Sequence, residues 1–327
     1  MRLFVKKIFP ISILLIACDS YAGVSFGNDQ FQFSSYGSLA SNIGSNFNYM
    51  PDSDTKLYGE STINYSNERY FGTLDNLYFS RVVNNNLKIK AGKLKLKDNL
   101  DYGASIGISK LPREIYSDNN IKNYDGINSL YQLNLTQDLK MSFQTLYGSS
   151  NSKIYGIEQT IEERQYDKIL GANTSIYTNY GKTRLSYLEI EPSFDNYDSD
   201  IDKGILTSIA HTYKNDLLKN YNEYIKRSFN GTDKTVDSYY TKFTYLQNFW
   251  EPYASYSNTI EKSGGTQQSY SIGFSYDLLG GVQLSSEYKK IFSDSDYAGD
   301  FSKTGIGLFS INSQDVEMFS IALNLNY

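Results

Sequence analysis

The last nine residues of the chain constrain its fold more than any other segment. Every second residue from Phe319 to Tyr327 is apolar, and the residues between them are serine, alanine or asparagine. Because side chains of a β-strand point alternately to opposite faces, this segment predicts a strand with one apolar face and one small or polar face.

The same alternation recurs along most of the chain, for example in 270–277 and 282–289. Several candidate strands exceed the roughly 5–6 residues usual in globular proteins and approach the roughly 9–11 of a tilted membrane strand. We expect strands at 30–43, 55–66, 71–83, 87–97, 123–135, 139–149, 168–178, 182–191, 204–213, 217–228, 236–247, 252–261, 267–277, 282–291 and 315–327. The chain is therefore predicted to be all-β.

Short turns alternate with long polar stretches between these strands. The short turns are expected at 84–86, 136–138, 179–181, 214–216, 248–251 and 279–281, and the long stretches near 98–122, 150–167, 192–203, 229–235, 261–266 and 292–314. This alternation is typical of a transmembrane antiparallel β-barrel, whose strand number is even. We therefore predict 16 strands, with one missed in 55–83 or 98–122, and with 14 or 18 as alternatives.

Composition agrees with a barrel that faces a membrane. Mean hydropathy is −0.47, and no stretch after the first twenty residues is apolar for the roughly 20 residues of a membrane helix. The chain has 31 Tyr and 18 Phe but 1 Trp, a bias that suits the aromatic belts at membrane interfaces. The net charge of −5 argues against nucleic-acid binding through a basic field.

The N-terminal segment has the pattern of a secretory signal. Arg2, Lys6 and Lys7 precede a short apolar run, and small residues before Gly23 provide a cleavage site. We expect residues 1–22 to be a signal peptide and 23–327 to be the barrel. Cys18 leaves an alternative, because the residues before it are similar to a lipoprotein lipidation site; cleavage after residue 22 would instead leave a mature chain without cysteine.

Four motifs stand out in this part of the chain: a Ser-Tyr-Gly step at 35–37, the lysine-rich strand 87–93, the loop sequence Leu-Pro-Arg-Glu-Ile-Tyr at 111–116 and a Tyr-Asp-Gly step at 124–126. On these motifs the region 36–148 resembles the Gram-negative porin superfamily that includes the phosphate-selective porins. The resemblance implies a water-filled, 16-stranded and usually trimeric channel in the bacterial outer membrane. Lys93 stands where the family often has arginine, so phosphate selectivity is not implied.

A lysine-rich strand is the candidate for pore lining. Lys88 and Lys90 differ in parity from Lys93, Lys95 and Lys97, so a bulge at Ala91–Gly92 is needed to bring all five to one face. That face would be the lumen, since lysine facing lipid is costly. The predicted function is a cationic stripe that attracts anions; the alternative is a wet strand whose lysines pair with acidic residues.

The long stretch 98–122 is the candidate constriction loop. In trimeric porins a long early loop enters the barrel, and the resemblance therefore implies Arg113 and Glu114 as charges at the narrowest point. The alternative is a solvated outer loop.

Catalytic and metal-binding signals are weak. His211 is the only histidine, so a nucleophile–base pair is poorly supported, and we predict no enzyme and no cofactor. The acidic runs 195–202 and 294–300 could bind Ca²⁺ or bridge lipopolysaccharide through divalent ions, although such runs are more often solvated loops.

The prediction is passive diffusion of small hydrophilic solutes and ions, with anions favoured by the lysine strand. The expected partners are these solutes, outer-membrane lipid, lipopolysaccharide and two further copies of the chain. One alternative is a channel specific for anions or oligosaccharides, in which lumenal tyrosines stack on sugars. An alternative of another class is an outer-membrane enzyme or a lipid-anchored adhesin.

Overall fold

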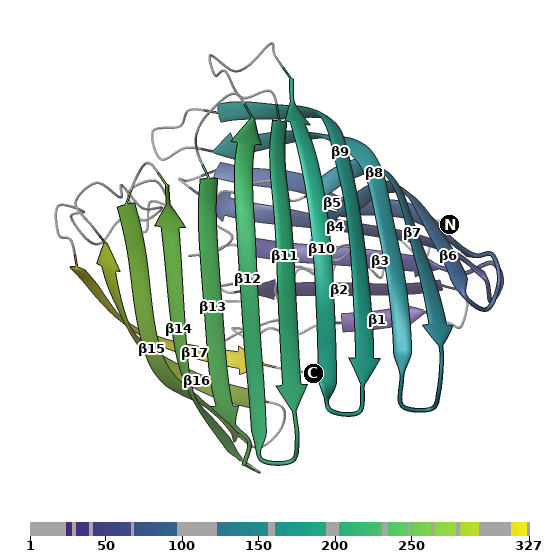
Figure 1. The fold of residues 1–327 in the computed structure, drawn as a ribbon. Helices are drawn as coiled ribbons and strands as arrows, with labels where there is room; N and C mark the ends of the chain where they lie inside the picture. Colours follow the sequence, from purple (N-terminus) through teal and green to yellow (C-terminus); the bar gives the residue numbers. More distant parts are fainter. Residues whose placement is uncertain are drawn as a thin grey trace.

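The computed structural model describes residues 24–27, 31–38, 42–66, 69–96, 123–155, 161–193, 203–230, 235–247, 249–262, 265–278, 282–293 and 315–325. These residues form one 17-stranded antiparallel sheet (Figure 1). Its strands are β1 (Val24–Gly27), β2 (Phe31–Ser38), β3 (Asn42–Tyr49), β4 (Thr55–Ser66), β5 (Arg69–Val82), β6 (Leu87–Lys95), β7 (Asn123–Asn134), β8 (Lys140–Tyr155), β9 (Ile161–Thr178), β10 (Gly181–Pro192), β11 (Lys203–Lys214), β12 (Leu218–Asn230), β13 (Thr235–Tyr245), β14 (Trp250–Glu261), β15 (Gly265–Leu278), β16 (Val282–Ser293) and β17 (Asp315–Leu325).

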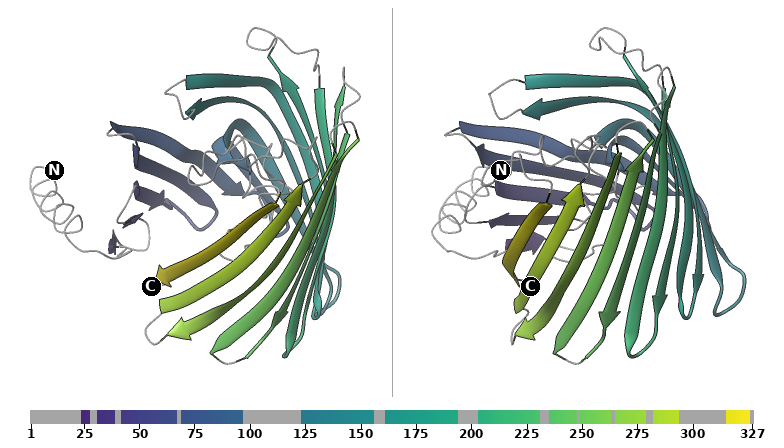
Figure 2. Two further views of the ribbon diagram at one scale, coloured as in Figure 1. Left: turned by 90° about the vertical axis from the view of Figure 1, so that its left-hand side faces the viewer. Right: turned by 60° about the vertical axis from the view of Figure 1, so that its left-hand side comes forward.

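The topology is a meander in which each strand pairs antiparallel with the next one along the chain. The sheet curls strongly, so that β4–β6 lie across the interior from β10–β13 (Figure 2). Among the described residues no residue-by-residue register joins β17 to β1 or β2, so the sheet is open along this seam. The prediction of an all-β, antiparallel fold is confirmed, whereas closure and a count of 16 strands are not.

The strands that the sequence analysis missed lie at the N-terminal end. Of the two proposed places for a missing strand, 55–83 is wrong, because it holds only the two expected strands, β4 and β5. The other place, 98–122, lies outside the described residues. The expected strand 30–43 is instead a pair, β2 and β3, preceded by the four-residue β1. Three asparagines and a glycine in β3 disguise it, since these residues favour turns.

The predicted short connections are confirmed where the structure describes them, and Figure 1 shows those of β7–β8, β9–β10 and β11–β12 at the same end of the sheet. Asparagine side chains stabilise two of them. The Asn84 Oδ1 accepts the backbone N–H of Asn86 and of Leu87, both at 2.9 Å, and Asn215 Oδ1 accepts those of Leu217 and Leu218 at 2.9 and 2.7 Å. Such Asx turns reverse the chain without a longer loop.

The expected long loop at 150–167 is wrong in its extent. β8 continues to Tyr155 and β9 begins at Ile161, so most of this stretch is strand. Most of its residues are polar, and Ile154, Ile157 and Ile161 do not recur at every second position, so the alternation on which the sequence analysis depended is missing.

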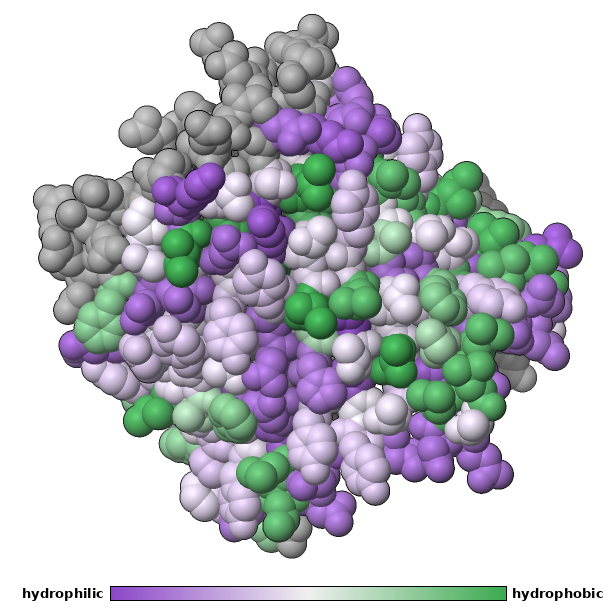
Figure 3. Space-filling view, viewed as in Figure 1, coloured by the Kyte–Doolittle hydropathy of each residue, from purple (hydrophilic) through white to green (hydrophobic). Residues whose placement is uncertain are grey.

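The two faces of the sheet have opposite character. Large apolar side chains on the convex face are exposed, among them Leu77, Ile127, Phe143, Ile272 and Phe274. Alternate residues on the concave face are buried although many of them are polar, including Asn76, Asn128, Ser175, Ser238 and Ser269. A space-filling view of the convex face over β10–β13 shows hydrophobic, intermediate and hydrophilic side chains mixed (Figure 3). Apolar residues outside and polar residues inside are the reverse of a soluble β-sandwich and fit a membrane barrel.

Apolar side chains are not confined to the convex face. A buried cluster on the concave face spans β6–β13 and includes Leu94, Tyr124, Leu146, Leu188 and Ile225. Leu96, the last residue described before the segment 97–122, belongs to the same cluster. The inner wall therefore combines a polar part with an apolar part, which the sequence analysis did not predict.

Helices of the described residues are too short or too polar to cross a membrane.

Candidate functional site

The inner wall of β6 carries two of the predicted pore-lining lysines. Lys90 pairs in register with Ser80 of β5 and Asn128 of β7, both of which are 1% exposed on the concave face. Lys88, two residues away, lies on the same face. The ammonium group of Lys90 stands 5.1 Å from the centre of the Tyr78 ring, a cation–π distance that orients this lysine along the wall.

The predicted bulge at Ala91–Gly92 is wrong. The register of β6 with β5 and with β7 runs through this point without an extra residue. Gly92 has φ +130°, and a Cβ atom there would lie 2.3 Å from the backbone oxygen of Leu77. The glycine permits a close approach of two strands and leaves the alternation unchanged. Lys93 is consequently on the face opposite Lys88 and Lys90, where its register neighbour Leu77 is exposed.

The register does shift at three other places in the described strands, and one of them lies on the neighbouring hairpin. The register between β4 and β5 shifts at Glu60/Ser61, and β5 carries the extra residue, Asp75. Asp75 and Asn76 therefore both reach the polar cluster on the concave side, where Thr62 and Thr73 donate hydrogen bonds to Asp75. Sequence pattern did not reveal this bulge, because no glycine marks it.

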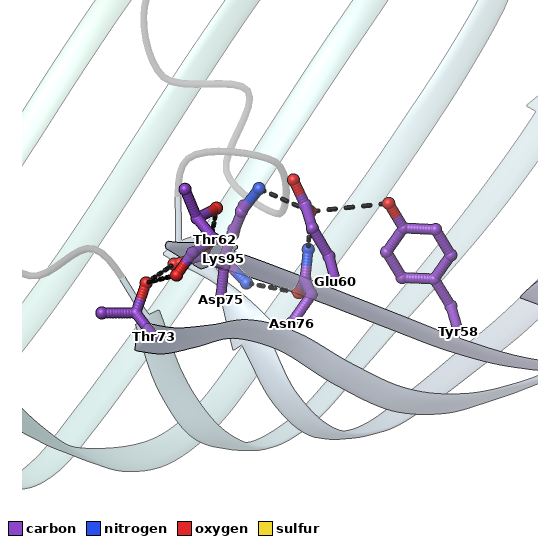
Figure 4. A network of polar contacts seen from close by, with 7 residues as sticks. All are labelled: Tyr58, Glu60, Thr62, Thr73, Asp75, Asn76 and Lys95. Carbon is purple, nitrogen blue, oxygen red and sulfur yellow. Dashed lines mark hydrogen bonds and ion pairs between the residues drawn. The ribbon is translucent and has the colours of Figure 1, made fainter. Parts of the chain in front are cut away.

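Lys95 has the same parity as Lys93, but at the end of β6 its side chain reaches this concave cluster. Its Nζ lies 2.6 Å from Oε2 of Glu60, and its backbone N–H donates to Asn76 Oδ1 at 3.2 Å. Asn76 also donates to Glu60 Oε2 at 3.3 Å, and Figure 4 shows these side chains pointing toward one another. For Lys95 the alternative of the sequence analysis therefore applies, because its charge is paired with a facing carboxylate.

A second set of charges lies across the interior, on β10–β13, and the sequence analysis missed it. Arg184 of β10 forms an ion pair with Glu223 of β12, and both side chains are almost fully buried. Tyr221 also donates a hydrogen bond to Glu223. Lys242 of β13 stands 3.6 Å from the centre of the Tyr253 ring. These residues are spread over four strands, so only a correct register could have grouped them.

The remaining wall, β13–β16, is lined by small hydroxyl side chains. Ser255 and Ser271 are 2.6 Å apart, Ser257 and Ser269 are 2.7 Å apart, and Thr259 donates to Ser238 at 3.1 Å. Short hydroxyl side chains leave room for water beside the wall.

Cationic residues outnumber anionic residues on the concave face of the described strands. The cationic residues are Lys56, Lys88, Lys90, Lys95, Lys140, Lys182, Arg184, Lys214, Lys219, Arg227, Lys242 and Lys289, and the anionic residues are Glu60, Asp75, Glu223, Glu251, Glu261, Asp277 and Glu287. This excess is opposite in sign to the net charge of −5 for the whole chain.

Several predicted residues lie outside the described part of the chain. These are the signal segment 1–22 with Cys18, Lys97, the loop residues Arg113 and Glu114, and the acidic runs 195–202 and 294–300. Within the described ranges no group of three or more histidine, cysteine or acidic side chains is placed to hold a metal ion.

His211 lies on the convex face of β11, away from the charged inner wall. Its Nδ1 is 2.9 Å from Oγ1 of Thr183, and the residue is exposed. No carboxylate of the described residues orients the ring in the manner of a catalytic triad.

Comparison with known proteins shows similarity at the level of structure alone. No protein-family model and no curated protein matches the sequence. OmpT of Vibrio cholerae, an outer-membrane protein, superposes with a TM-score of 0.57 at 12% identity, over 83% of this chain and 90% of that one. The anion-selective porin of Comamonas acidovorans gives 0.52 at 10% identity, over 80% and 82% of the two chains.

The outer-membrane channel DcaP of Acinetobacter baumannii gives a TM-score of 0.51 at 15% identity, over 86% of this chain and 83% of that chain. Identities this low establish the fold and not the solute. The resemblance inferred from region 36–148 is thereby confirmed for the architecture. The chain has the antiparallel β-sheet fold of the Gram-negative outer-membrane porins.

Proposed function

We propose that this protein is an outer-membrane channel through which small hydrophilic solutes and ions diffuse passively, with a preference for anions. The observation that carries the proposal is the combination of an apolar convex face with an inner wall on which cationic residues predominate. Charges that line a pore select ions of the opposite sign.

The positions of the cationic side chains support anion preference. Lys88 and Lys90 lie on the concave face of β6, and Lys182 and Lys242 lie on that of β10 and β13. Figure 2 shows β4–β6 across the interior from β10–β13. An anion between these walls would be attracted from both sides, and a cation would be repelled from both. The neighbour from Comamonas acidovorans is described as anion-selective, which agrees with this charge arrangement.

We propose that the loop 98–122, with Arg113 and Glu114, narrows the pore. Leu96 and Tyr124, which flank this segment, are 3% and 0% exposed and belong to the apolar cluster of the inner wall. The loop is therefore flanked at both ends by residues that belong to the inner wall. Replacing Arg113 and Glu114 by alanine should then raise the single-channel conductance and admit larger sugars.

The proposal includes assembly as a homotrimer in a membrane containing lipopolysaccharide. A structure of OmpT from Vibrio cholerae is described as a trimer form, and it superposes with a TM-score of 0.52 over 83% of this chain. No enzymatic activity is proposed, because the chain's single histidine lies on the convex face with Thr183 as its hydrogen-bond partner.

Planar-bilayer recording on the refolded protein tests the proposal. With a tenfold KCl gradient we expect the current to rise in steps as single channels insert. We also expect a reversal potential that has the sign of the chloride equilibrium potential. A reversal potential at zero or on the potassium side would refute anion preference, and the absence of any conductance would refute a channel.

A substrate-specific channel is the second candidate, and one feature favours it. Tyr58 and Tyr78 stack on the inner wall with ring centres 5.3 Å apart, and Lys56 and Lys90 lie 5.0 and 5.1 Å from the centres of these two rings. Aromatic faces beside ammonium groups can hold a sugar ring that carries an acidic group. Saturable block of chloride current by an acidic oligosaccharide, lost in Tyr58→Ala, would distinguish this channel from a general pore.

A further inference from the structure

Two opposite charges on the inner wall of β13–β16 lie near one another without pairing. Lys242 of β13 is 8% exposed, Glu287 of β16 is half-buried, and both belong to the concave face. Within the described part of the chain neither side chain forms an ion pair, whereas the buried Arg184 and Glu223 pair with each other. Charged groups taken out of water normally have a partner of opposite sign.

The side chain of Tyr253, on the strand β14, separates these two charges. Nζ of Lys242 stands 3.6 Å from the centre of the Tyr253 ring, and the Tyr253 hydroxyl donates to Oε2 of Glu287 at 2.8 Å. The ammonium group is therefore at the face of the ring and the carboxylate is at its hydroxyl. The ring interacts with each charge but does not neutralise either of them.

Gly273 of β15 fixes the position of this ring. Tyr253 and Gly273 are register neighbours, and a Cβ atom on Gly273 would lie 2.5 Å from Cζ of Tyr253 and 2.6 Å from its hydroxyl oxygen. The missing side chain therefore leaves room for the ring to lie against the wall and to reach Glu287 on the next strand. Packing of an aromatic ring over a glycine of a neighbouring strand also stabilises the sheet.

Two serine hydroxyls continue the polar surface between the charges. Ser255 is the register neighbour of Lys242, and its Oγ lies 2.6 Å from that of Ser271. Ser271 in turn donates to Oε2 of Glu287 at 3.3 Å. Both hydrogen bonds that the described residues make to Glu287 use Oε2, so Oε1 remains available as an acceptor. Ammonium, hydroxyl and carboxylate groups are thus arranged along four adjacent strands.

This combination of charges determines which solute fits the wall. A simple anion that is attracted by Lys242 would be repelled by Glu287. A simple cation would be repelled by Lys242 and by Lys289, which is the register neighbour of Ser271. A solute that carries a carboxylate and an ammonium group close together would be attracted at both places, because its charges are complementary to those of the wall.

We propose that Lys242, Tyr253 and Glu287 form a binding subsite for small zwitterionic solutes of the α-amino acid type. The carboxylate of the solute contacts Lys242 and the Ser255 hydroxyl, and its ammonium group donates to Oε1 of Glu287. The subsite rests on the proposed channel function and names a class of solute for it. An amino acid has no net charge at neutral pH, so the general anion preference of the pore does not by itself predict this binding.

Block of chloride current by L-serine tests the subsite. The refolded protein is recorded in planar bilayers in dilute KCl, with L-serine or glycerol added to one side. The two solutes are similar in size and both carry hydroxyl groups, but only serine is a zwitterion. We expect serine to reduce the current in a saturable manner, and glycerol at the same concentration to leave it nearly unchanged.

Substitutions assign the block to the two charges. Glu287→Gln removes the negative charge but keeps an acceptor for Tyr253, and Lys242→Met removes the positive charge but keeps the length of the side chain. Each should raise the half-blocking concentration of serine at least tenfold, because hydrogen bonds between charged groups are among the strongest. Lys242→Arg keeps the charge and should keep the block. Lys140→Met, which removes a charge from the concave face of β8, is the matched control and should leave the block nearly unchanged.

The outcomes separate this inference from the proposed function. Equal block by serine and glycerol would overturn the subsite, since any small solute in the pore would then reduce the current. Serine block that survives Glu287→Gln would also overturn it, because the wall would then recognise only the carboxylate. A protein that carries chloride current without any serine block would overturn the subsite and leave the channel in place. A protein without current before any substitution would refute the channel itself.

Discussion

Arg184 of β10 and Glu223 of β12 form a buried ion pair that passes over Ala210 of the intervening strand β11. The small side chain of Ala210, itself buried, leaves space for the guanidinium group between its two neighbours. Breaking a buried pair on one side leaves an uncompensated charge and costs about 3–5 kcal/mol. We therefore expect Arg184→Ala to lower the free energy of unfolding by this amount, measured by urea titration of the refolded protein in detergent.

The double variant Arg184→Met and Glu223→Met is the matched control for this prediction. It removes both charges and keeps similar volume, and such replacements are often neutral or stabilising. We expect it to recover most of the stability lost in the single variant. Equal losses in the single and double variants would show that the pair stabilises through packing and not through charge.

The two lumenal lysines of β6 should control ion selectivity more than Lys93. Lys88→Glu together with Lys90→Glu reverses two charges on the concave wall, so we expect the reversal potential in a KCl gradient to move toward the potassium side. Lys93→Glu changes the convex face, where the effect on the pore should be much smaller. A larger shift from Lys93→Glu than from the pair would contradict the register-based assignment of faces.

Alternation in the sequence was sufficient to predict the strand type, the short turns and most strand positions from β4 onward. It worked because segments such as β15 separate apolar from small residues at every step. It did not find β3, because asparagine and glycine there suit a turn as well as a strand. It also gave too short a β8, since residues beyond Gly148 are polar on both faces.

The candidate site was harder to predict than the fold, because it depends on register. Lys88 and Lys90 could be placed on one wall from their spacing. The face to which the lysines after Gly92 point could be assigned only from the pairing of β6 with its partner strands. The bulge at Asp75 lies on the neighbouring hairpin and reaches Thr62 and Thr73 there. The pair Arg184–Glu223 joins residues 39 positions apart, and one sequence gives no local signal for such a contact.

We expect a glycine to be required at position 126 of β7, where its register neighbours are Gly92 of β6 and Gly148 of β8. A Cβ atom on Gly126 would lie 2.1 Å from the backbone oxygen of Tyr147 and 2.7 Å from Cα of Gly148. Both neighbours are backbone and cannot move aside without separating the strands. Gly126→Ala should therefore destabilise the protein by about 1–3 kcal/mol or more, as overpacking does.

Gly72 of β5 provides the control for this substitution. A Cβ atom there would meet nothing within 4 Å, so Gly72→Ala should leave the unfolding free energy nearly unchanged. Samples of both variants are heated to a series of temperatures and then run on a gel under conditions that keep folded protein folded. The temperature at which the folded band disappears is compared between the two variants. A Gly126→Ala protein as heat-resistant as Gly72→Ala would show that the strands are farther apart than the structure has them.

Two positions on opposite faces of β15 should respond differently to a new positive charge. Ile272 is 64% exposed on the convex face, whereas Ser275 lies on the concave face beside Ser285. Lysine at the centre of a lipid-facing strand costs about 2–4 kcal/mol, and lysine in a water-filled lumen is tolerated. We expect Ile272→Lys to reduce the folding free energy in lipid vesicles by that amount and Ser275→Lys to change it little. Ser275→Lys should also increase anion preference, since it adds a positive charge to the wall. If both variants fold equally well in vesicles, the convex face of β15 does not contact lipid, and the orientation of the whole sheet in the membrane would have to be reversed.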